Sequence, residues 1–266
     1  MSQSEHTTTA DTYWTDVVSN PYFQNVTSDF ITLLIFVVVG WLVHRLMTRA
    51  RLLTFFGVKG RKRVVLYLSS VRVMPGGSVG VDNQPRSYGG IAIPENEARL
   101  IPLFQRLFNF LVPGFESQPG PLKMLTMSDV TVDAVPSPAD NGDVERSSSF
   151  VAVGSPAYNS ASLHIERAFT PIACFKSDYS GFVLQNVPDI TSTRCCFVQR
   201  VFDQTTNQTA FYVAGMSALG TTGAAYYLAA QWRYLSKKYP HPKPFCVVLQ
   251  IVSDDAHMYQ VLFEKG

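Results

Sequence analysis

An uncharged apolar run near the N-terminus constrains this chain more than any other feature of its sequence. Residues 30–43 read FITLLIFVVVGWLV, and the run extends to Met47 once His44 and Arg45 reach the lipid headgroups. A helix that spans a bilayer needs about 20 apolar residues, with a range of about 17–25. Snorkelling arginines and the residues just before the run complete that length. The sequence therefore predicts one transmembrane helix over residues 30–47.

The basic residues around this run indicate its direction across the membrane. Residues 1–30 contain neither Lys nor Arg. The basic residues that follow the run are Arg45, Arg49, Arg51, Lys59, Arg61, Lys62 and Arg63. The positive-inside rule then places the N-terminus outside, whereas a signal peptide would carry its positive charges before the run. We expect a single-pass protein of the inner (cell) membrane.

This orientation divides the chain into four segments. They are an extracytoplasmic tail (1–29), the transmembrane helix (30–47), a basic juxtamembrane linker (48–62) and a cytosolic domain (63–266). In the linker, apolar residues such as Leu52 and Phe55 alternate with basic ones, which suits a segment lying along the inner headgroups. A plain linker helix is the alternative.

Strand and helix patterns alternate through the cytosolic part. Strands are predicted over 64–71, 125–135, 150–154, 172–175, 182–184, 197–202, 210–214, 245–252 and 257–263, and helices over 94–112, 158–168 and 221–238. Continuously apolar strands between helices indicate an α/β fold, in which a mixed sheet is covered on both faces as a three-layer sandwich. Such sheets bind ligands beyond the carboxyl ends of their strands, where the strand order reverses.

A glycine-rich segment, GMSALGTTG at 215–223, is the first candidate binding site. Gly215 and Gly220 permit tight turns, the following helix offers free N–H groups, and Ser217, Thr221 and Thr222 add hydroxyls, so the segment suits a phosphate or another anion. It is not a Walker A motif, because Thr221 stands where that motif has Lys. The alternative is close packing of the helix on the sheet.

A second strand-to-helix connection contains Gly154, Ser155 and Asn159. Ser155 suits a helix cap, and the Asn159 amide suits contact with a base, a sugar or a carboxylate. Capping alone is the alternative. A third connection, which includes Glu95 and Glu97, is a candidate for another wall of the same pocket.

Two enzyme hypotheses have candidate residues. Ser217, Asp254 and His257 follow the chain order of a hydrolase triad, although the last two lie unusually close in sequence. Hydrolysis of the glycosidic bond of a nucleotide would need a carboxylate beside the pocket, for which Glu166 is a candidate, as are the two acids of the third connection. Ser217 and Glu166 are therefore the catalytic candidates. Whether the protein is an enzyme stays open.

Composition argues against two classes of partner. The net charge is only +2, and basic residues do not interleave with aromatics as in a nucleic-acid-binding surface. The four cysteines form no C-x-x-C pair and have no His at ligand spacing, so no metal site is expected.

The cytosolic part resembles the Rossmann-like nucleotide-sensing domains that bacteria tether to a membrane segment in conflict and phage-defence systems. The residues behind this resemblance are VVLYLSS at 64–70, VGSPAYN at 153–159 and AGMSALGTT at 214–222, downstream of a single helix. The resemblance implies ligand-triggered signalling or toxicity at the membrane, and a nucleotide as the ligand.

We therefore expect a membrane-anchored cytosolic domain that binds a small anionic ligand, a nucleotide for preference, as a sensor or effector. The alternatives are a membrane-bound hydrolase of a nucleotide or ester, and a structural subunit of a membrane complex. The bilayer is the expected partner, and no cofactor beyond the nucleotide is implied. One apolar helix cannot line a pore alone, so any channel role requires a homo-oligomer.

Overall fold

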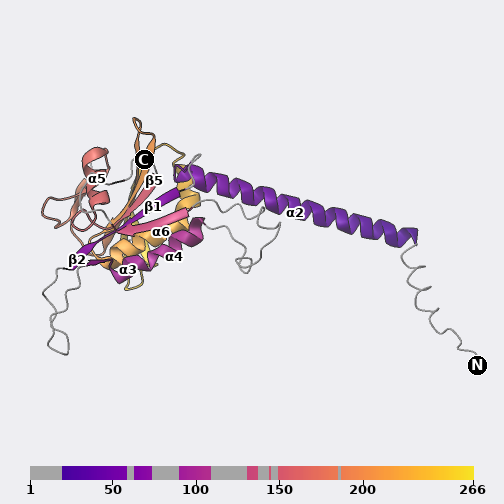
Figure 1. Cartoon of the computed structure of the whole chain (residues 1–266), viewed down its shortest axis with the longest axis horizontal. Coiled ribbons are helices and arrows are strands. Elements are labelled where there is room, and N and C mark those ends of the chain that lie inside the picture. Colours follow the sequence, from indigo (N-terminus) through magenta and orange to yellow (C-terminus); the bar gives the residue numbers. More distant parts are fainter. Residues whose placement is uncertain are drawn as a thin grey trace, which may run out of the picture. The chain divides into compact units, whose positions relative to one another are not determined.

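The computed structural model describes residues 20–58, 63–73, 90–108, 131–136, 144, 149–184 and 187–266. The chain divides into two compact units, Met1–Ala50 and Arg51–Gly266. One long helix, α2 (Pro21–Phe55), makes up nearly all of the described part of the first unit and ends within the second (Figure 1).

The apolar character of α2 is continuous around its circumference, because the run from Phe30 to Val43 contains no charged residue. Every side chain from residue 28 to residue 41 is exposed. Helices that are apolar all round belong to protein cores or to membranes, and this exposure sets α2 apart from a core helix. The segment Ser28–Phe55 is long and apolar enough to cross a membrane.

The last turns of α2 differ from the linker expected over residues 48–62. Leu52, Phe55, Phe56 and Val58 are all buried in the core of the second unit. The end of the apolar helix is therefore part of the globular core. Residues 59–62 lie outside the described residues.

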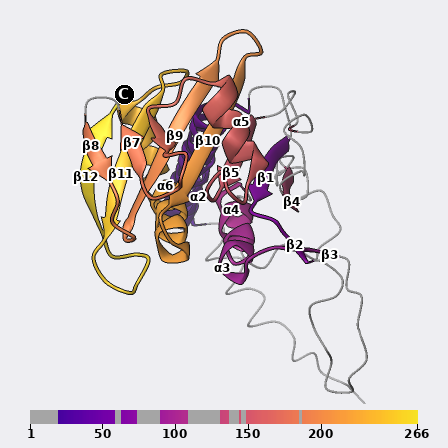
Figure 2. The ribbon, with the colours of Figure 1, turned by 90° about the vertical axis from the view of Figure 1, so that its left-hand side faces the viewer.

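Seven strands form the main sheet, in the order β12-β11-β9-β10-β5-β1-β4 (Figure 2). Their bounds are β1 (Arg63–Leu68), β4 (Thr131–Pro136), β5 (Ser149–Val153), β9 (Cys195–Asp203), β10 (Gln208–Gly215), β11 (Phe245–Ile251) and β12 (Tyr259–Lys265). The pairs β10–β5, β5–β1 and β1–β4 are parallel, and the other three pairs are antiparallel. Only β9 and β12 run against the rest, so the sheet is mixed with most strands pointing one way, as expected.

Two small sheets accompany the main one. One pairs β2 (Val71–Val73) with β3 (Gly90–Ala92), and the other joins β6 (Ala173–Phe175), β7 (Phe182–Leu184) and β8 (Val187–Ile190). The sequence patterns indicated β6 and β7. They did not indicate β3 or β8, and they gave only the first residue of β2, as the end of the strand predicted over 64–71.

The helices pack on both faces of the main sheet. Their bounds are α3 (Glu95–Ala98), α4 (Leu100–Phe108), α5 (Ser160–Ala168) and α6 (Ala218–Lys238). Side chains of β1 alternate between two cores: Leu66 and Leu68 join the core that includes α4 and α6, whereas Val65 and Tyr67 join the core that includes α5, β6 and β7. Burial on both faces explains why the strands are continuously apolar.

The helix predicted over 94–112 is two helices, α3 and α4, which meet at Arg99. The last four residues of that predicted helix and the first part of the strand predicted over 125–135 lie outside the described residues.

Candidate functional site at the carboxyl ends of β1 and β5

The strand order reverses at β1. From β1 the chain passes to β4 on one side and then returns to β5 on the other side. In open α/β sheets, the crevice for a ligand lies beyond the carboxyl ends of the strands at such a reversal. The residues just after Leu68 and Val153 therefore lie at the position of the candidate site.

A buried carboxylate lies at this reversal. Glu97, on the short helix α3, is only 5% exposed. Its Oε2 accepts a hydrogen bond of 2.6 Å from the backbone N–H of Ser69, the first residue after β1. Burial raises the pKa of Glu97, while the hydrogen bonds from Ser69 oppose that rise. A carboxyl group of this kind, at this position, is a feature of binding and catalytic sites more than of ordinary surfaces.

Gly154 approaches the same carboxylate from β5. Its φ is +106°, a conformation that side-chain-bearing residues rarely adopt. A Cβ at this position would lie 2.1 Å from Ser69 Oγ and 3.0 Å from Glu97 Oε1. The loops after β1 and β5 and the helix α3 thus converge within contact distance of one another.

Asn159 is fully occupied by backbone partners. Its Oδ1 accepts from the N–H groups of Ala161 and Ser162 at the start of α5. Its Nδ2 donates to the carbonyl oxygens of Tyr67 and Val153, at 3.0 and 2.7 Å. The amide therefore ties the ends of β1 and β5 to α5, and it caps that helix, a role that the sequence suggested for Ser155.

Ser155 and Ser162 form further hydrogen bonds in the loop that follows β5. Ser155 is half-buried, and its carbonyl oxygen accepts from the N–H groups of Tyr158 and Asn159. Ser162 Oγ donates to the carbonyl oxygen of Gly154 at 2.7 Å. The structure thus groups Gly154, Ser155 and Asn159 with Glu97.

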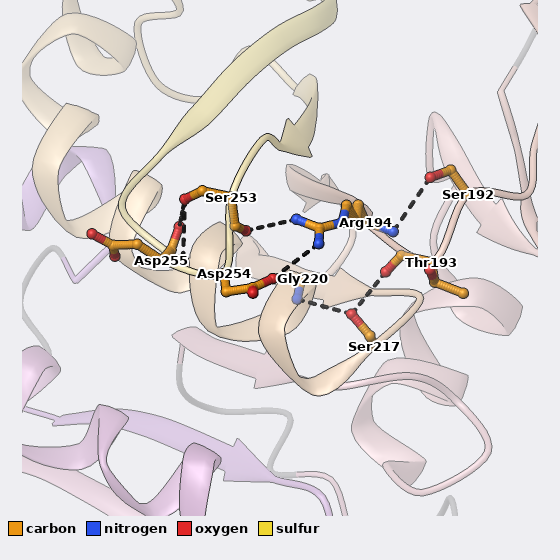
Figure 3. A network of polar contacts seen from close by, with 8 residues as sticks. All are labelled: Ser192, Thr193, Arg194, Ser217, Gly220, Ser253, Asp254 and Asp255. Carbon is orange, nitrogen blue, oxygen red and sulfur yellow. Dashed lines mark hydrogen bonds and ion pairs between the residues drawn. The ribbon is translucent and has the colours of Figure 1, made fainter.

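The side-chain hydroxyls of the 215–223 segment form hydrogen bonds with the backbone of the same segment or of Thr193. Ser217 Oγ accepts from Gly220 N–H at 3.2 Å and donates to the Thr193 carbonyl at 2.7 Å (Figure 3). Thr221 Oγ1 accepts from Gly215 N–H, and Thr222 Oγ1 donates to the Ala218 carbonyl.

Gly215 and Gly223 of this segment have no room for a side chain. A Cβ on Gly215 would lie 2.6 Å from the carbonyl carbon of Gly220, and one on Gly223 would lie 2.4 Å from Ile251 Cδ1. These contacts are those of close helix–sheet packing, the alternative that the sequence left open beside anion binding.

The three residues in hydrolase order have separate partners. Ser217 bonds as described above, and Asp254 pairs with Arg194 at 2.9 Å (Figure 3). His257 contacts Tyr226, with the ring centroids 4.1 Å apart and the ring planes tilted by 40°. This geometry offers no support for Ser217 as an activated nucleophile, which would need a base within hydrogen-bond reach.

Glu166 joins elements on the other face of the sheet. Its Oε1 accepts from the Phe175 N–H at 2.9 Å and from the buried Tyr212 hydroxyl at 3.0 Å. Burial raises the pKa of Glu166, and these bonds oppose the rise. The carboxylate connects α5 with β6 and β10, about 10 Å along α5 from the cap residue Asn159.

Sequence reasoning missed Ser69 and Ser162 and gave Glu97 a secondary part. Its position directly after a buried strand is the signal that would have pointed to Ser69, whereas no local pattern marks Ser162 or the burial of Glu97. Among the described residues, no group of three or more His, Cys, Asp or Glu side chains is placed to hold a metal ion.

Comparison with protein families, curated proteins and solved structures gives no match for this chain. The fold and the site thus define the class of protein by its architecture. It is a mixed α/β domain that follows an N-terminal apolar helix and has a buried carboxyl group at the reversal of strand order.

Proposed function

We propose that this protein is a membrane-anchored α/β domain that binds a small polar ligand at the carboxyl ends of β1 and β5, as a sensor or effector. The observation that carries the proposal is the buried Glu97 at the reversal of strand order. Burying a carboxyl group costs free energy unless the group is well hydrogen-bonded. We therefore infer that the buried carboxyl group of Glu97 has a functional role.

A nucleotide is the ligand class that this chemistry favours. A buried carboxyl group accepts hydrogen bonds from the N–H groups of a nucleobase or from ribose hydroxyls. The phosphates would lie away from Glu97, since two negative groups repel. The same proposal includes a Rossmann-like arrangement of three layers, in which the ligand binds at the carboxyl ends of the strands.

The membrane part of the proposal rests on α2. Its apolar, exposed stretch is long enough to span a bilayer, which we propose is the inner membrane. Because the basic residues follow this stretch, the N-terminus lies outside and the α/β domain lies on the cytoplasmic side. Carbonate extraction of membranes, followed by protease treatment of intact and opened cells, tests this. We expect the α/β domain to stay in the membrane fraction and to be cut only after opening.

The ligand part is tested by binding to the full chain in mild detergent. Adenine, guanine, cytosine and uracil nucleotides are compared by their effect on the unfolding temperature. We expect one class to raise it for the wild type and for Glu95→Gln, and to have little effect on Glu97→Gln. A panel without effect on the wild type would remove the support for a nucleotide.

One observation favours hydrolysis as a second candidate. Because burial raises the pKa of Glu97, its carboxyl group is suited to donate a proton to a leaving group. Product formation from a nucleotide that is lost in Glu97→Gln, and retained in Ser217→Ala, would support a hydrolase.

A further inference from the structure

The end of α2 and the C-terminus of α6 lie at the same edge of the second unit. Arg200, on β9, is fully buried, and its guanidinium donates to the carbonyl oxygens of Phe55 at 3.3 Å and Tyr239 at 2.7 Å. It also donates to the carbonyl oxygen of Lys243. Three chain segments therefore meet around one side chain, where α2 enters the globular core.

This edge is also where the parallel strands begin. Gly57, just after α2, lies against Thr209 at the start of β10 and against Ser149 at the start of β5. The carboxyl ends of β1 and β5, with Glu97, are at the other end of the sheet. A strand of six residues is roughly 20 Å long, so the two edges are well separated.

The described charges at this anchor-proximal edge are mainly positive. The basic residues there are Arg51, Arg63, Lys237, Lys238, Lys243 and Lys265, and all six are exposed. The acidic residues are Asp133, Asp203 and Glu264. Asp133 is paired with Arg63, and Glu264 is paired with Lys238. Asp203 accepts hydrogen bonds from Thr205 and Thr206.

The length of the chain keeps this edge near the end of the apolar segment. Phe55 lies eight positions after Met47, and both lie in the continuous helix α2. Eight helical residues span about 12 Å. Whatever the orientation of the two units, the entry point of α2 lies within that distance of the residue that ends the predicted membrane helix.

We propose that the anchor-proximal edge docks on anionic phospholipid headgroups of the membrane that holds α2. The inference rests on the membrane anchoring proposed above. Lysine and arginine side chains within a Debye length of an anionic leaflet are attracted to it. Lys243 supplies one of the carbonyl oxygens that Arg200 binds, and Lys237 lies two residues before Tyr239, which supplies another. Docking would hold the Glu97 edge toward the cytoplasm, open to a soluble ligand.

The test uses the full chain in nanodiscs of phosphatidylcholine, with or without phosphatidylglycerol. Hydrogen exchange is measured by mass spectrometry for peptides that contain the backbone N–H groups of Tyr239, His241 and Lys243, and for the hairpin turn at 203–208. We expect several-fold slower exchange when phosphatidylglycerol is present, and loss of that protection in high salt. Equal exchange in the two lipids would overturn the proposal.

A pair of matched variants separates docking from net charge. Lys237→Glu with Lys243→Glu is expected to abolish the lipid-dependent protection. Arg99→Glu with Arg167→Glu changes the net charge equally at exposed positions away from this edge, and it should keep the protection. Slow exchange within β10 shows that each variant is folded. Protection retained in the lysine variant would contradict docking.

The same nanodisc preparation distinguishes a failure of the proposed anchoring from a failure of the proposed docking. If the wild type does not enter nanodiscs of either lipid, the anchoring itself is wrong, and the docking proposal falls with it. If it enters both and shows no lipid-dependent protection, anchoring stands and docking is overturned.

Discussion

Arg200 and Glu97 are buried ionisable side chains whose surroundings differ. The Arg200 guanidinium contacts backbone carbonyl groups and the rings of Phe55 and Phe245, each with its centroid 5.0 Å away. Desolvation lowers the pKa of Arg200 to about 10, so it keeps its charge at neutral pH. Backbone carbonyls and aromatic faces thus replace the water that a guanidinium would otherwise need.

Replacing Arg200 is expected to destabilise the second unit strongly. Arg200→Met leaves several buried carbonyl groups without a donor, at a cost of about 2–4 kcal/mol. The free energy of unfolding in detergent, followed by tryptophan fluorescence, measures it. Arg233→Met is the matched control, because Arg233 is exposed on α6. Similar losses in both variants would show that the carbonyl contacts of Arg200 contribute little.

The buried carboxyl group of Glu97 predicts a pH dependence of stability. Its pKa is higher in the folded protein than the ordinary value of 4.5, so the folded state holds this proton more tightly than the unfolded state. The stabilisation is complete below the ordinary value and is lost as the pH rises through the raised pKa. Unfolding measured between about pH 4 and pH 8 should show this loss.

Glu97→Gln removes the titrating group and keeps an acceptor for Ser69 N–H. We expect it to match or exceed the wild type in stability at neutral pH and to lack this component of the pH dependence. Glu95→Gln, two residues away and exposed in its pair with Arg99, should follow the wild type. A pH profile of Glu97→Gln that coincides with that of the wild type would contradict this account.

At the scale of elements, the approach of α6 to the sheet depends on its glycines. A Cβ on Gly215 would lie 2.6 Å from the backbone nitrogen of Thr221, whereas one on Gly220 would lie 3.2 Å from the Cys195 carbonyl oxygen. Backbone atoms cannot move aside as a flexible side chain can. The tight turn before α6 therefore needs glycine most at position 215.

Gly215→Ala should consequently lower the free energy of unfolding by roughly 1–3 kcal/mol, the usual cost of overpacking. Gly220→Ala should cost less, because alanine also favours the helix by about 1 kcal/mol. Gly40→Ala in α2, with nothing within 4 Å of the added Cβ, is the control and should not lower the free energy of unfolding. Equal effects of the first two substitutions would contradict the packing argument.

Long elements were predictable because their patterns repeat. The strand β10, buried at all eight positions, and the helix α6, ended by Lys237 and Lys238 before Pro240, follow directly from apolar runs and helix-stop residues. The last turns of α2 were not predictable in the same way. Leu52 and Phe55 between arginines suit a membrane surface and a protein core equally well, and only the tertiary structure distinguishes the two.

The candidate site was also predictable only in part. Asn159 was found from its position after a strand, but whether its amide faces a ligand or the backbone depends on contacts with Tyr67, 92 residues away. Glu97 looked like one of two ordinary acids at a helix start. Its burial comes from the meeting of β1, β5 and α3, and no local pattern records such a meeting.

At the scale of the whole molecule, the proposed anchoring and the proposed ligand binding belong to opposite ends of one sheet. The helix α2 enters the core where the parallel strands begin, and the buried carboxyl group lies where β1 and β5 end. A ligand can act on the anchor only if it binds two states of the protein with different affinity. The sheet between the edges is the element through which such a difference would pass.

The central claim is that the Glu97 edge holds a small ligand, and native mass spectrometry of the full chain purified from cells in mild detergent tests it most directly. The account predicts a small molecule of nucleotide mass bound to the wild type and to Glu95→Gln, and absent from Glu97→Gln, with all three variants folded. The same occupancy on Glu97→Gln as on the wild type would contradict the account, because the ligand would then lie elsewhere.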